Sequence, residues 1–206
     1  MKARITKIER LKNSQDRYVL HFEDETKLKV AGSLIAKFSL FSGCELEQDE
    51  LQRLKSELES HNVRARAAAM VGARPLSEQE LKRKLIQKGS SERDAEDAAA
   101  WLEEIGAIDD AKYASTLVRH YSARGYGRAK IRDEFWKRGI PRDIWDEALE
   151  EYSTDEDSMQ RFIEARLKNG AERREIKRVS DALYRRGFSW DEIKNALAKY
   201  IEDFPE

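Results

Sequence analysis

The stretch that decides the fold is Ile131-Arg132-Asp133-Glu134-Phe135-Trp136-Lys137-Arg138-Gly139. It places two large apolar residues four positions apart and closes on a basic residue followed by glycine. Apolar residues at this spacing lie on one face of a helix, and a glycine in the left-handed conformation is a common helix end. The stretch therefore predicts an amphipathic helix that ends at Gly139.

The same pattern surrounds two further glycines, Gly89 and Gly187, which lie 50 positions before and 48 positions after Gly139. Counted from each glycine, position −1 is basic, positions −4 and −8 are large and apolar, and position +9 is alanine. In chain order these are Lys88, Arg138 and Arg186 at −1; Leu85, Phe135 and Leu183 at −4; Leu81, Ile131 and Val179 at −8; and Ala98, Ala148 and Ala196 at +9. A pattern that returns at a fixed period indicates a repeat architecture.

A second helix is predicted after each glycine. Position +2 holds Ser91, Pro141 or Ser189, and each of these residue types favours a helix start. Ser91 with Asp94, and Ser189 with Glu192, fit the spacing of a capping box. Apolar residues follow at helical spacing: Ala95, Ala98, Ala99 and Leu102; Trp145, Ala148, Leu149 and Tyr152; and Ile193, Ala196, Leu197 and Tyr200.

A third helix precedes each glycine-terminated helix, and in the second unit we expect it to begin at Asp109-Asp110. We predict three-helix repeats at 62–108, 109–154 and 155–206, with a linking helix at 47–61. The linking segment and the start of the first repeat form either one long helix or two helices broken near His61-Asn62. Units of this size bury little surface alone, so neighbouring repeats should stack into an elongated array.

Residues 1–46 have a different pattern, in which Tyr18, Leu20 and Phe22 alternate with more polar positions, as in a half-buried strand. Residues 27–30 and 5–8 are candidate partner strands. We expect a small three-stranded sheet with residues 33–40 packed across it. The predicted fold is thus mainly α, three tandem three-helix repeats after a small β-containing segment.

Charge is segregated within the repeats, although the formal net charge is only −1. Residues 111–140 carry eight basic side chains against two acids, and residues 141–157 carry eight acids against Arg142 alone. Two readings stay open: solvated faces that pair with each other, or a basic stripe suited to phosphates or to an acidic protein groove. The candidate binding residues are Lys82, Arg83, Arg119, Arg124, Arg128, Lys130, Arg132, Lys137, Arg138, Arg173, Arg174, Lys177, Arg178, Arg185 and Arg186.

Arg128 and Lys130 stand near the start of their helix, where a positive charge is electrostatically unfavourable, and this favours an external partner. We expect replacement of Arg128, Lys130 and Lys137 by glutamate to leave the fold intact and to weaken partner binding. The nearby aromatic residues Tyr121, Tyr126 and Trp136 belong either to the core or to the same contact surface.

No signature of catalysis or of a bound cofactor is found in the sequence. It lacks a phosphate-binding loop and a dinucleotide fingerprint, and its three histidines and single Cys44 build no zinc cluster. The acidic pairs Asp109-Asp110 and Asp155/Asp157 are better explained as helix caps than as metal ligands. Residues 1–10 are charged and lack the apolar region of a signal peptide, so we expect none. No apolar run is long enough to cross a bilayer, and the lone cysteine fits a reducing compartment. We expect a cytoplasmic protein that is not an enzyme and needs no cofactor.

Four segments of the chain form an ordered set: Arg74-Pro75-Leu76-Ser77-Glu78-Gln79-Glu80-Leu81-Lys82-Arg83-Lys84-Leu85, Ile108-Asp109-Asp110-Ala111-Lys112-Tyr113-Ala114, Gly125-Tyr126-Gly127-Arg128-Ala129-Lys130-Ile131 and Arg185-Arg186-Gly187-Phe188-Ser189. In this order they resemble the RecX family of bacterial recombinase regulators. The resemblance covers about residues 62–203, and residues 1–46 resemble the extension of longer members. One departure is Ser90, which stands where the other two repeats have Ile140 and Phe188.

The resemblance implies a monomeric modulator, most simply an inhibitor, of a RecA recombinase in homologous recombination, DNA repair and the SOS response. Family members bind the filament of RecA on single-stranded DNA and suppress ATP hydrolysis and strand exchange. The slightly acidic net charge argues against autonomous DNA affinity more than against filament binding. A sequence-nonspecific DNA-binding protein that acts without a recombinase is the alternative, and a metal-dependent nuclease is a third reading.

Overall fold

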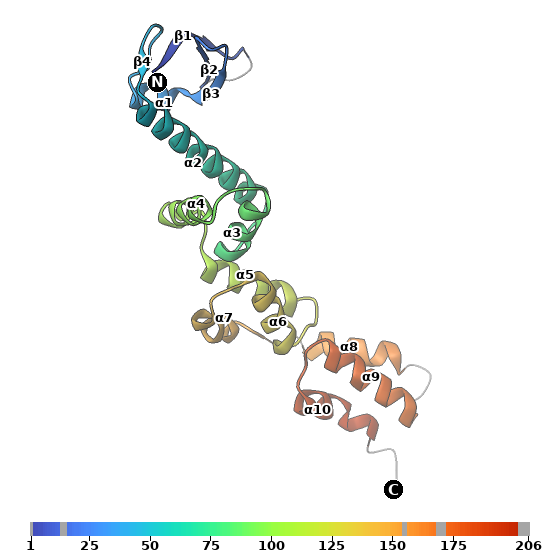
Figure 1. Cartoon of the computed structure of the whole chain (residues 1–206). Coiled ribbons are helices and arrows are strands. Elements are labelled where there is room, and N and C mark those ends of the chain that lie inside the picture. Colours follow the sequence, from blue (N-terminus) through green and yellow to red (C-terminus); the bar gives the residue numbers. More distant parts are fainter. Residues whose placement is uncertain (1, 13–15, 154–155, 168–171, 202–206) are drawn as a thin grey trace. The chain divides into compact units, whose positions relative to one another are not determined.

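The computed structural model describes residues 2–12, 16–153, 156–167 and 172–201 (Figure 1). The chain forms two compact units. The first contains Met1–Met70 and Leu85–Leu102, and the second contains Val71–Lys84 and Glu103–Glu206. Helix α3, Glu78–Gln87, begins in the second unit and ends in the first.

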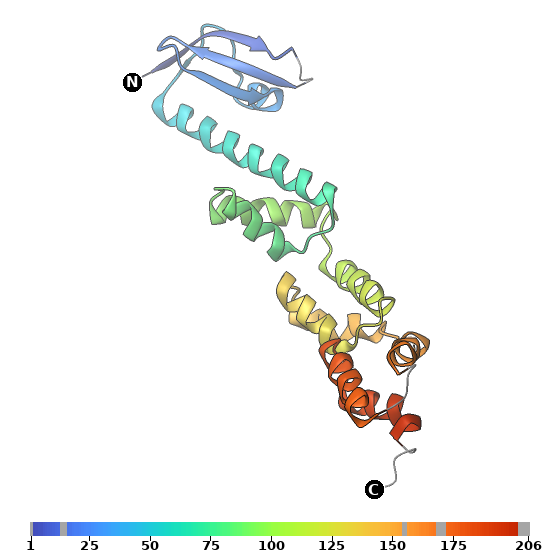
Figure 2. The ribbon, with the colours of Figure 1, turned by 90° about the vertical axis from the view of Figure 1, so that its right-hand side faces the viewer.

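The first unit begins with an antiparallel sheet in the order β3-β2-β1-β4 (Figure 2). Its strands are β1 Ala3–Arg10, β2 Arg17–Phe22, β3 Lys27–Ala31 and β4 Glu45–Leu46. The prediction of three strands was wrong by one. The missing strand, β4, pairs only Glu45 and Leu46 with the start of β1, and two residues are too few to show an alternating pattern.

The core of the sheet is closed by two helices, α1 Gly32–Lys37 and α2 Gln48–Ala73. Ile5, Leu20 and Val30 from the strands share one buried cluster with Leu34 of α1 and Leu54 of α2. The segment 33–40 thus packs on the sheet as predicted. Of the two alternatives for residues 47–73, the structure has the single uninterrupted helix.

Helix α4, Glu92–Glu104, packs in the first unit beside α2. The Ser60 hydroxyl donates to Asp94 at 2.8 Å, and the Arg66 guanidinium donates to the Ser90 hydroxyl at 3.1 Å. Ser90 is therefore buried with a polar partner at the position where the other two repeats bury Ile140 and Phe188. This contact accounts for the departure at Ser90.

The second unit contains the start of α3 and the remaining helices, arranged as three-helix repeats. They are α5 Asp110–Ser122, α6 Arg128–Arg138, the 3₁₀ helix η1 Arg142–Ile144, α7 Trp145–Glu150, α8 Glu156–Arg166, α9 Arg173–Arg185 and α10 Trp190–Ile201. One buried cluster, which includes Phe135 and Leu149, joins α5, α6 and α7. A second, which includes Ile163 and Leu183, joins α8, α9 and α10. The predicted mainly α repeat fold is confirmed. The exact repeat boundaries remain predictions, and that at 154/155 lies outside the described residues.

The predicted helix ends are confirmed by backbone geometry. Gly89, Gly139 and Gly187 have φ of 89°, 67° and 89°, in the left-handed region. The backbone N–H of Asp94 and of Glu192 donates to the hydroxyl of Ser91 and of Ser189, respectively, as capping boxes require. These local signals therefore set the register of all three repeats.

Candidate functional site

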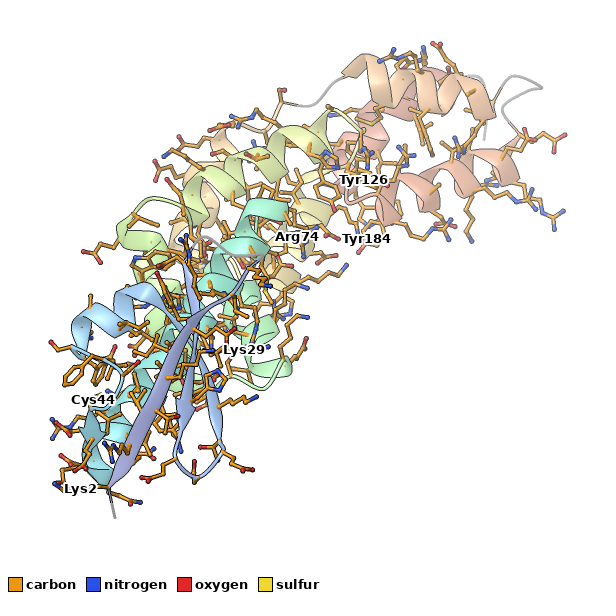
Figure 3. The ribbon with its side chains drawn as sticks, turned by 90° about the horizontal axis from the view of Figure 1, so that it is seen from above. Lys2, Lys29, Cys44, Arg74, Tyr126 and Tyr184 are labelled. Atoms are coloured by element: carbon orange, nitrogen blue, oxygen red, sulfur yellow. The ribbon has the colours of Figure 1, made fainter. Side chains whose placement is uncertain are left out.

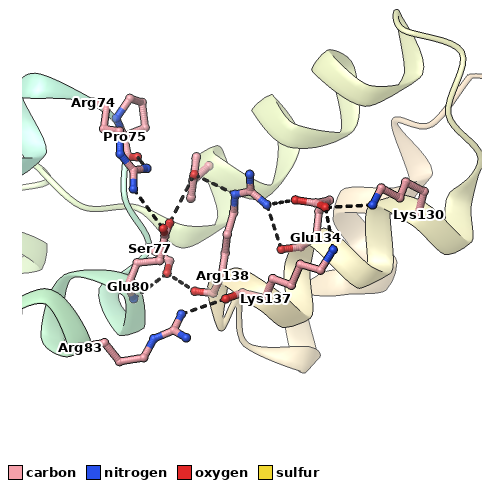
Figure 4. A network of polar contacts seen from close by, with 10 residues as sticks. Arg74, Pro75, Ser77, Glu80, Arg83, Lys130, Glu134, Lys137 and Arg138 are labelled. Atoms are coloured by element: carbon pink, nitrogen blue, oxygen red, sulfur yellow. Dashed lines mark hydrogen bonds and ion pairs between the residues drawn. The ribbon is translucent and has the colours of Figure 1, made fainter. Parts of the chain in front are cut away.

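Successive repeats are joined where one glycine turn meets the preceding glycine-terminated helix. At the first junction the start of α3 meets the end of α6 (Figure 4). The Ser77 hydroxyl donates to the carbonyl oxygen of Arg138, and Arg83 donates to the carbonyl oxygen of Lys137 at 2.9 Å. Carbonyls at the end of a helix lack partners within their own helix. Those of α6 are thus satisfied by the preceding repeat.

The second junction, between α6 and α9, uses the same repeat positions. The N–H of Gly127 donates to the carbonyl oxygen of Arg186 at 3.0 Å, and that of Ala129 donates to Gly187 at 3.1 Å. Gly127 and Ser77 both occupy position −12 of their repeats, and Arg186 and Arg138 both occupy position −1. A Cβ on Gly127 would lie 2.1 Å from the Gly187 carbonyl oxygen. Glycine is needed there because the two backbones touch.

Glu134 is a buried acid in α6 that forms ion pairs with three of the predicted binding residues (Figure 4). Lys130 and Lys137 each place Nζ 3.2 Å from its Oε1, and Arg138 binds its Oε2. Burial alone would raise the pKa of Glu134, but hydrogen bonds from Arg138, Lys130 and Lys137 outweigh burial and lower the pKa to about 2. These three cations therefore stabilise a buried carboxylate of their own repeat.

The fifteen predicted binding residues divide into two groups. Eight are held by groups of the protein itself, either by a carboxylate (Lys82, Arg119, Lys130, Arg132, Lys137 and Arg138) or by a backbone carbonyl (Arg83 and Arg186). Arg186 also lies over the rings of Tyr126 and Phe162, 5.4 and 4.2 Å from their centroids. For these eight, the structure favours pairing within the fold.

The other seven have no ion pair with a carboxylate in the described part of the chain. They are Arg124, Arg128, Arg173, Arg174, Lys177, Arg178 and Arg185, and all are exposed. Arg128 lies over the ring of Tyr152, 5.1 Å from its centroid. Five of the seven belong to α9. Of the fifteen predicted binding residues, those that remain available to a partner are therefore concentrated on that helix.

Three aromatic side chains are exposed near the ends of α6 and α9 and at the start of α10. Trp136, Tyr184 and Trp190 are 66%, 55% and 57% exposed. Trp136 is not a core residue, whereas Tyr121 and Tyr126 are partly buried and pack edge to face on each other. The signal was present in the repeat register, because Trp136 and Tyr184 share position −3. Figure 3 labels Tyr126 and Tyr184 in the view from above.

The acidic pair Asp109-Asp110 caps helices, as predicted, although Asp110 caps the helix of another repeat and not its own. The carboxylate of Asp109 accepts from the N–H of Lys112 at the start of α5, and that of Asp110 accepts from the N–H of Glu78 at the start of α3. Burial raises the pKa of Asp110. The caps predicted at Asp155 and Asp157 depend on side chains that the structure does not describe. Within the described residues, no three acidic, histidine or cysteine side chains form a group that would hold a metal ion.

No helix in the described part of the chain is both long enough and apolar enough to span a membrane.

Comparison with known proteins gives a consistent result. Residues 109–149 match the family description "RecX, second three-helix domain". The chain is 30% identical over 208 residues to the regulatory protein RecX of Clostridium acetobutylicum, covering 97% of each chain. It is 36% identical to that of Pelodictyon phaeoclathratiforme, over 64% of this chain and 84% of the relative.

Solved structures agree on the fold. A crystal structure of a regulatory protein RecX superposes with a TM-score of 0.77 at 23% identity, covering 96% of this chain and 99% of the other. A second, of RecX from Lactobacillus salivarius, gives a TM-score of 0.62 at 20% identity over 69% of this chain and 96% of the other.

Proposed function

The chain belongs to the RecX family of regulatory proteins, and from this premise we propose that it modulates, as an inhibitor, a RecA-type recombinase in the cytoplasm. It binds the filament that the recombinase forms on single-stranded DNA, and it suppresses ATP hydrolysis and strand exchange. It does so without catalysis of its own and without a cofactor, acting as a monomer. The coarser statement, a regulatory role, follows from family membership alone.

The observation that carries the finer proposal is the set of exposed cations on α9 that have no carboxylate partner in the described part of the chain. A filament of protein on DNA offers acidic groups of two kinds, carboxylates of the protein and phosphates of the nucleic acid. Both attract a positively charged face, and complementary charge across an interface contributes to specificity and to the association rate. Binding across several subunits would hold them in one arrangement, and this would slow ATP turnover.

The test is the rate of ATP hydrolysis by the recombinase on single-stranded DNA, titrated with this protein. We expect the rate to fall as the protein is added. The variant R174E/R178E/R185E, which reverses charge on α9, should need a much higher concentration for the same effect. Because interactions between exposed charges are screened, the difference between parent and variant should shrink at high salt.

A matched control reverses three exposed cations of the N-terminal sheet and its loop, as K12E/K27E/K29E, with the same change in net charge. We expect this control to inhibit like the parent. Equal loss in both variants would mean that net charge, not the α9 surface, matters. A hydrolysis rate that stays constant at saturating protein would contradict the proposal.

The second candidate, a nonspecific DNA-binding protein that needs no recombinase, is favoured by the same exposed cations. It predicts tight binding to naked duplex DNA with a steep salt dependence, because each neutralised phosphate releases counterions. Strong binding of this kind, without any effect on the recombinase, would favour the second candidate over the first.

A further inference from the structure

Two repeats carry an exposed aromatic ring at position −3 that contacts the side chain at position +3. In the third repeat Tyr184, at −3, stacks on Trp190, at +3, with ring centroids 5.1 Å apart and planes inclined by 20°. In the second repeat the guanidinium of Arg142, at +3, lies over the ring of Trp136, at −3, 5.3 Å from its centroid. The glycine turn brings positions −3 and +3 together in both repeats.

These rings are not parts of a core. Stacking on each other still leaves Tyr184 and Trp190 more than half exposed, and Trp136 is 66% exposed beside Arg142. Position −3 of the first repeat is also an exposed apolar residue, Ile86. Single exposed apolar residues are ordinary on a protein surface. Exposure of large apolar residues at one position in all three repeats is a pattern, and it indicates a shared contact role.

Cations of α9 lie next to the stacked pair of the third repeat. Arg173 and Lys177 precede Tyr184 by eleven and seven positions, so the three lie along one side of the helix. Arg174, Arg178 and Arg185 form the neighbouring row, each one position later. Asp181 is the one acid between Lys177 and Tyr184 in the sequence. One side of α9 that ends at the aromatic pair thus carries two cations and the acid Asp181, and the neighbouring row carries three cations.

We infer that the Tyr184–Trp190 pair is a stacking platform for an unpaired base of single-stranded nucleic acid, whose phosphates bind the cation rows of α9. The Trp136–Arg142 pair is the equivalent platform of the second repeat. This inference rests on the proposed function. It says that the aromatic pair and the cations of α9 contact the nucleic acid of the filament. Aromatic rings with adjacent cations are what binding of single strands requires, since every base offers a planar face and every nucleotide a phosphate.

A single strand fits this surface better than the alternatives. In a duplex the bases are stacked on one another and their faces are covered, so a platform of this kind has nothing to bind. An acidic protein segment would neutralise the cations but would not require two stacked rings beside them. The arrangement therefore predicts that bases, as well as phosphates, contribute to affinity.

The experiment measures binding of the full-length protein to a fluorescent oligothymidine, to the same oligomer without bases, and to duplex DNA, all at low salt. The parent should bind the oligothymidine most tightly. The variant Y184A/W190A should bind it about tenfold more weakly, which is the size of effect expected when one base loses its stacking on an aromatic side chain. The variant Y184F/W190F, which keeps both rings, should bind like the parent.

Binding to the oligomer without bases should be the same for the parent and for Y184A/W190A, because only the phosphates remain. As a matched control, F41A removes Phe41, an aromatic ring of the first unit that is 63% exposed, and should leave all affinities unchanged. Circular dichroism and the melting midpoint should be those of the parent in every variant, because the rings are exposed.

Three results would overturn the inference: no measurable binding of the parent to oligothymidine, equal loss of binding to both oligomers, or unchanged binding by Y184A/W190A. If Y184A/W190A binds DNA like the parent but no longer slows ATP hydrolysis, the rings contact protein and the inference is wrong while the proposed function stands. If the parent binds single strands through the rings but never affects the recombinase, the platform stands and the proposed function fails.

Discussion

Helices α6 and α9 occupy the same place in successive repeats, and both are rich in arginine and lysine, yet their cations have different roles. In α6, Lys130, Lys137 and Arg138 surround the buried carboxylate of Glu134. In α9, Arg174 and Arg178 are exposed, and no carboxylate in the described part of the chain pairs with them. A run of basic residues is therefore no measure of the charge that a surface offers to a partner.

The two helices also differ at their starts. The start of α6 is covered by the Gly187 turn of the next repeat, through the N–H groups of Gly127 and Ala129. At the start of α9, Arg173 and Arg174 are exposed. The start of α6 is therefore covered by backbone of the next repeat, and its cations pair with Glu134 of the same helix, whereas α9 keeps its cations on the surface.

The largest expected effect comes from charge reversal in α6. From the sequence, the change of Arg128, Lys130 and Lys137 to glutamate should leave the fold intact, but the structure changes that expectation. Glu134 would lose two of its three cations and face new negative charges, and breaking a buried ion pair costs about 3 to 5 kcal/mol. Chemical denaturation should show a loss of this size. R174E/R178E/R185E should lose no more than about 1 kcal/mol. Similar losses in both helices would remove the distinction between them.

The second largest effect is a pH dependence of stability that comes from α6 and not from α9. The pKa of Glu134 is lowered from its ordinary value of 4.5 to about 2 in the folded protein. Its contribution to stability is therefore complete above about pH 4.5 and is lost as the pH falls toward 2, a change of about 3 kcal/mol. The free energy of unfolding of the parent should fall through this range.

The variant E134Q is the control for that pH dependence, since it keeps the shape and removes the titration. The difference between parent and E134Q cancels the other acids, including Asp110, whose raised pKa acts in the opposite direction. A difference that does not change with pH between about 4.5 and 2 would mean that the cations do not stabilise the carboxylate.

The starts of the two helices should differ by a smaller amount. G127A adds a methyl group where the Gly187 carbonyl leaves no room, although φ of −81° at this residue is compatible with alanine. We expect a loss of about 1 to 3 kcal/mol from overpacking. The matched change at position −12 of α9, E175A, should cost less than about 1 kcal/mol. Equal melting midpoints for G127A and the parent would show that the backbone around Gly187 can shift to accept the methyl group at little cost.

The smallest effect is expected where the two helices are alike. W136A and Y184A each remove an exposed ring at position −3 and should each change the free energy of unfolding by less than about 1 kcal/mol. A loss of several kcal/mol in either variant would mean that the ring has a structural role, and the matching of the two repeats would fail there.

Local features of the fold could be predicted from the sequence. The glycine ends, the capping boxes and the helical stripes each depend on residues a few positions apart, and each was confirmed. The two-residue strand β4 could not be found, because it exists only through pairing with Ala3 and Arg4 far along the chain. The contact between Gly127 and Gly187 is equally nonlocal, and glycine alone does not say what approaches it.

The candidate site was harder to predict, for a physical reason. The neutralisation of Lys130 and Arg138 was visible in principle, because Glu134 lies four positions from each and such pairs meet on a helix. Whether Glu134 was buried among them depends on tertiary packing. The side of the helix on which position −3 lies was also readable from the stripe at −4 and −8. Its exposure depends on what the neighbouring repeat covers.

Two amides at the junction between α6 and α9 report on the detachment of the third repeat through their hydrogen exchange. The amide protons of Gly127 and Ala129 are shielded by carbonyls of another repeat, not by their own helix. Their exchange with deuterated solvent thus requires the third repeat to detach, even while each repeat stays folded. If detachment precedes unfolding, these two amides will exchange faster than those in the middle of α6. The ratio of their observed rate to the rate of an unprotected amide gives the free energy of undocking, when reclosing is faster than exchange.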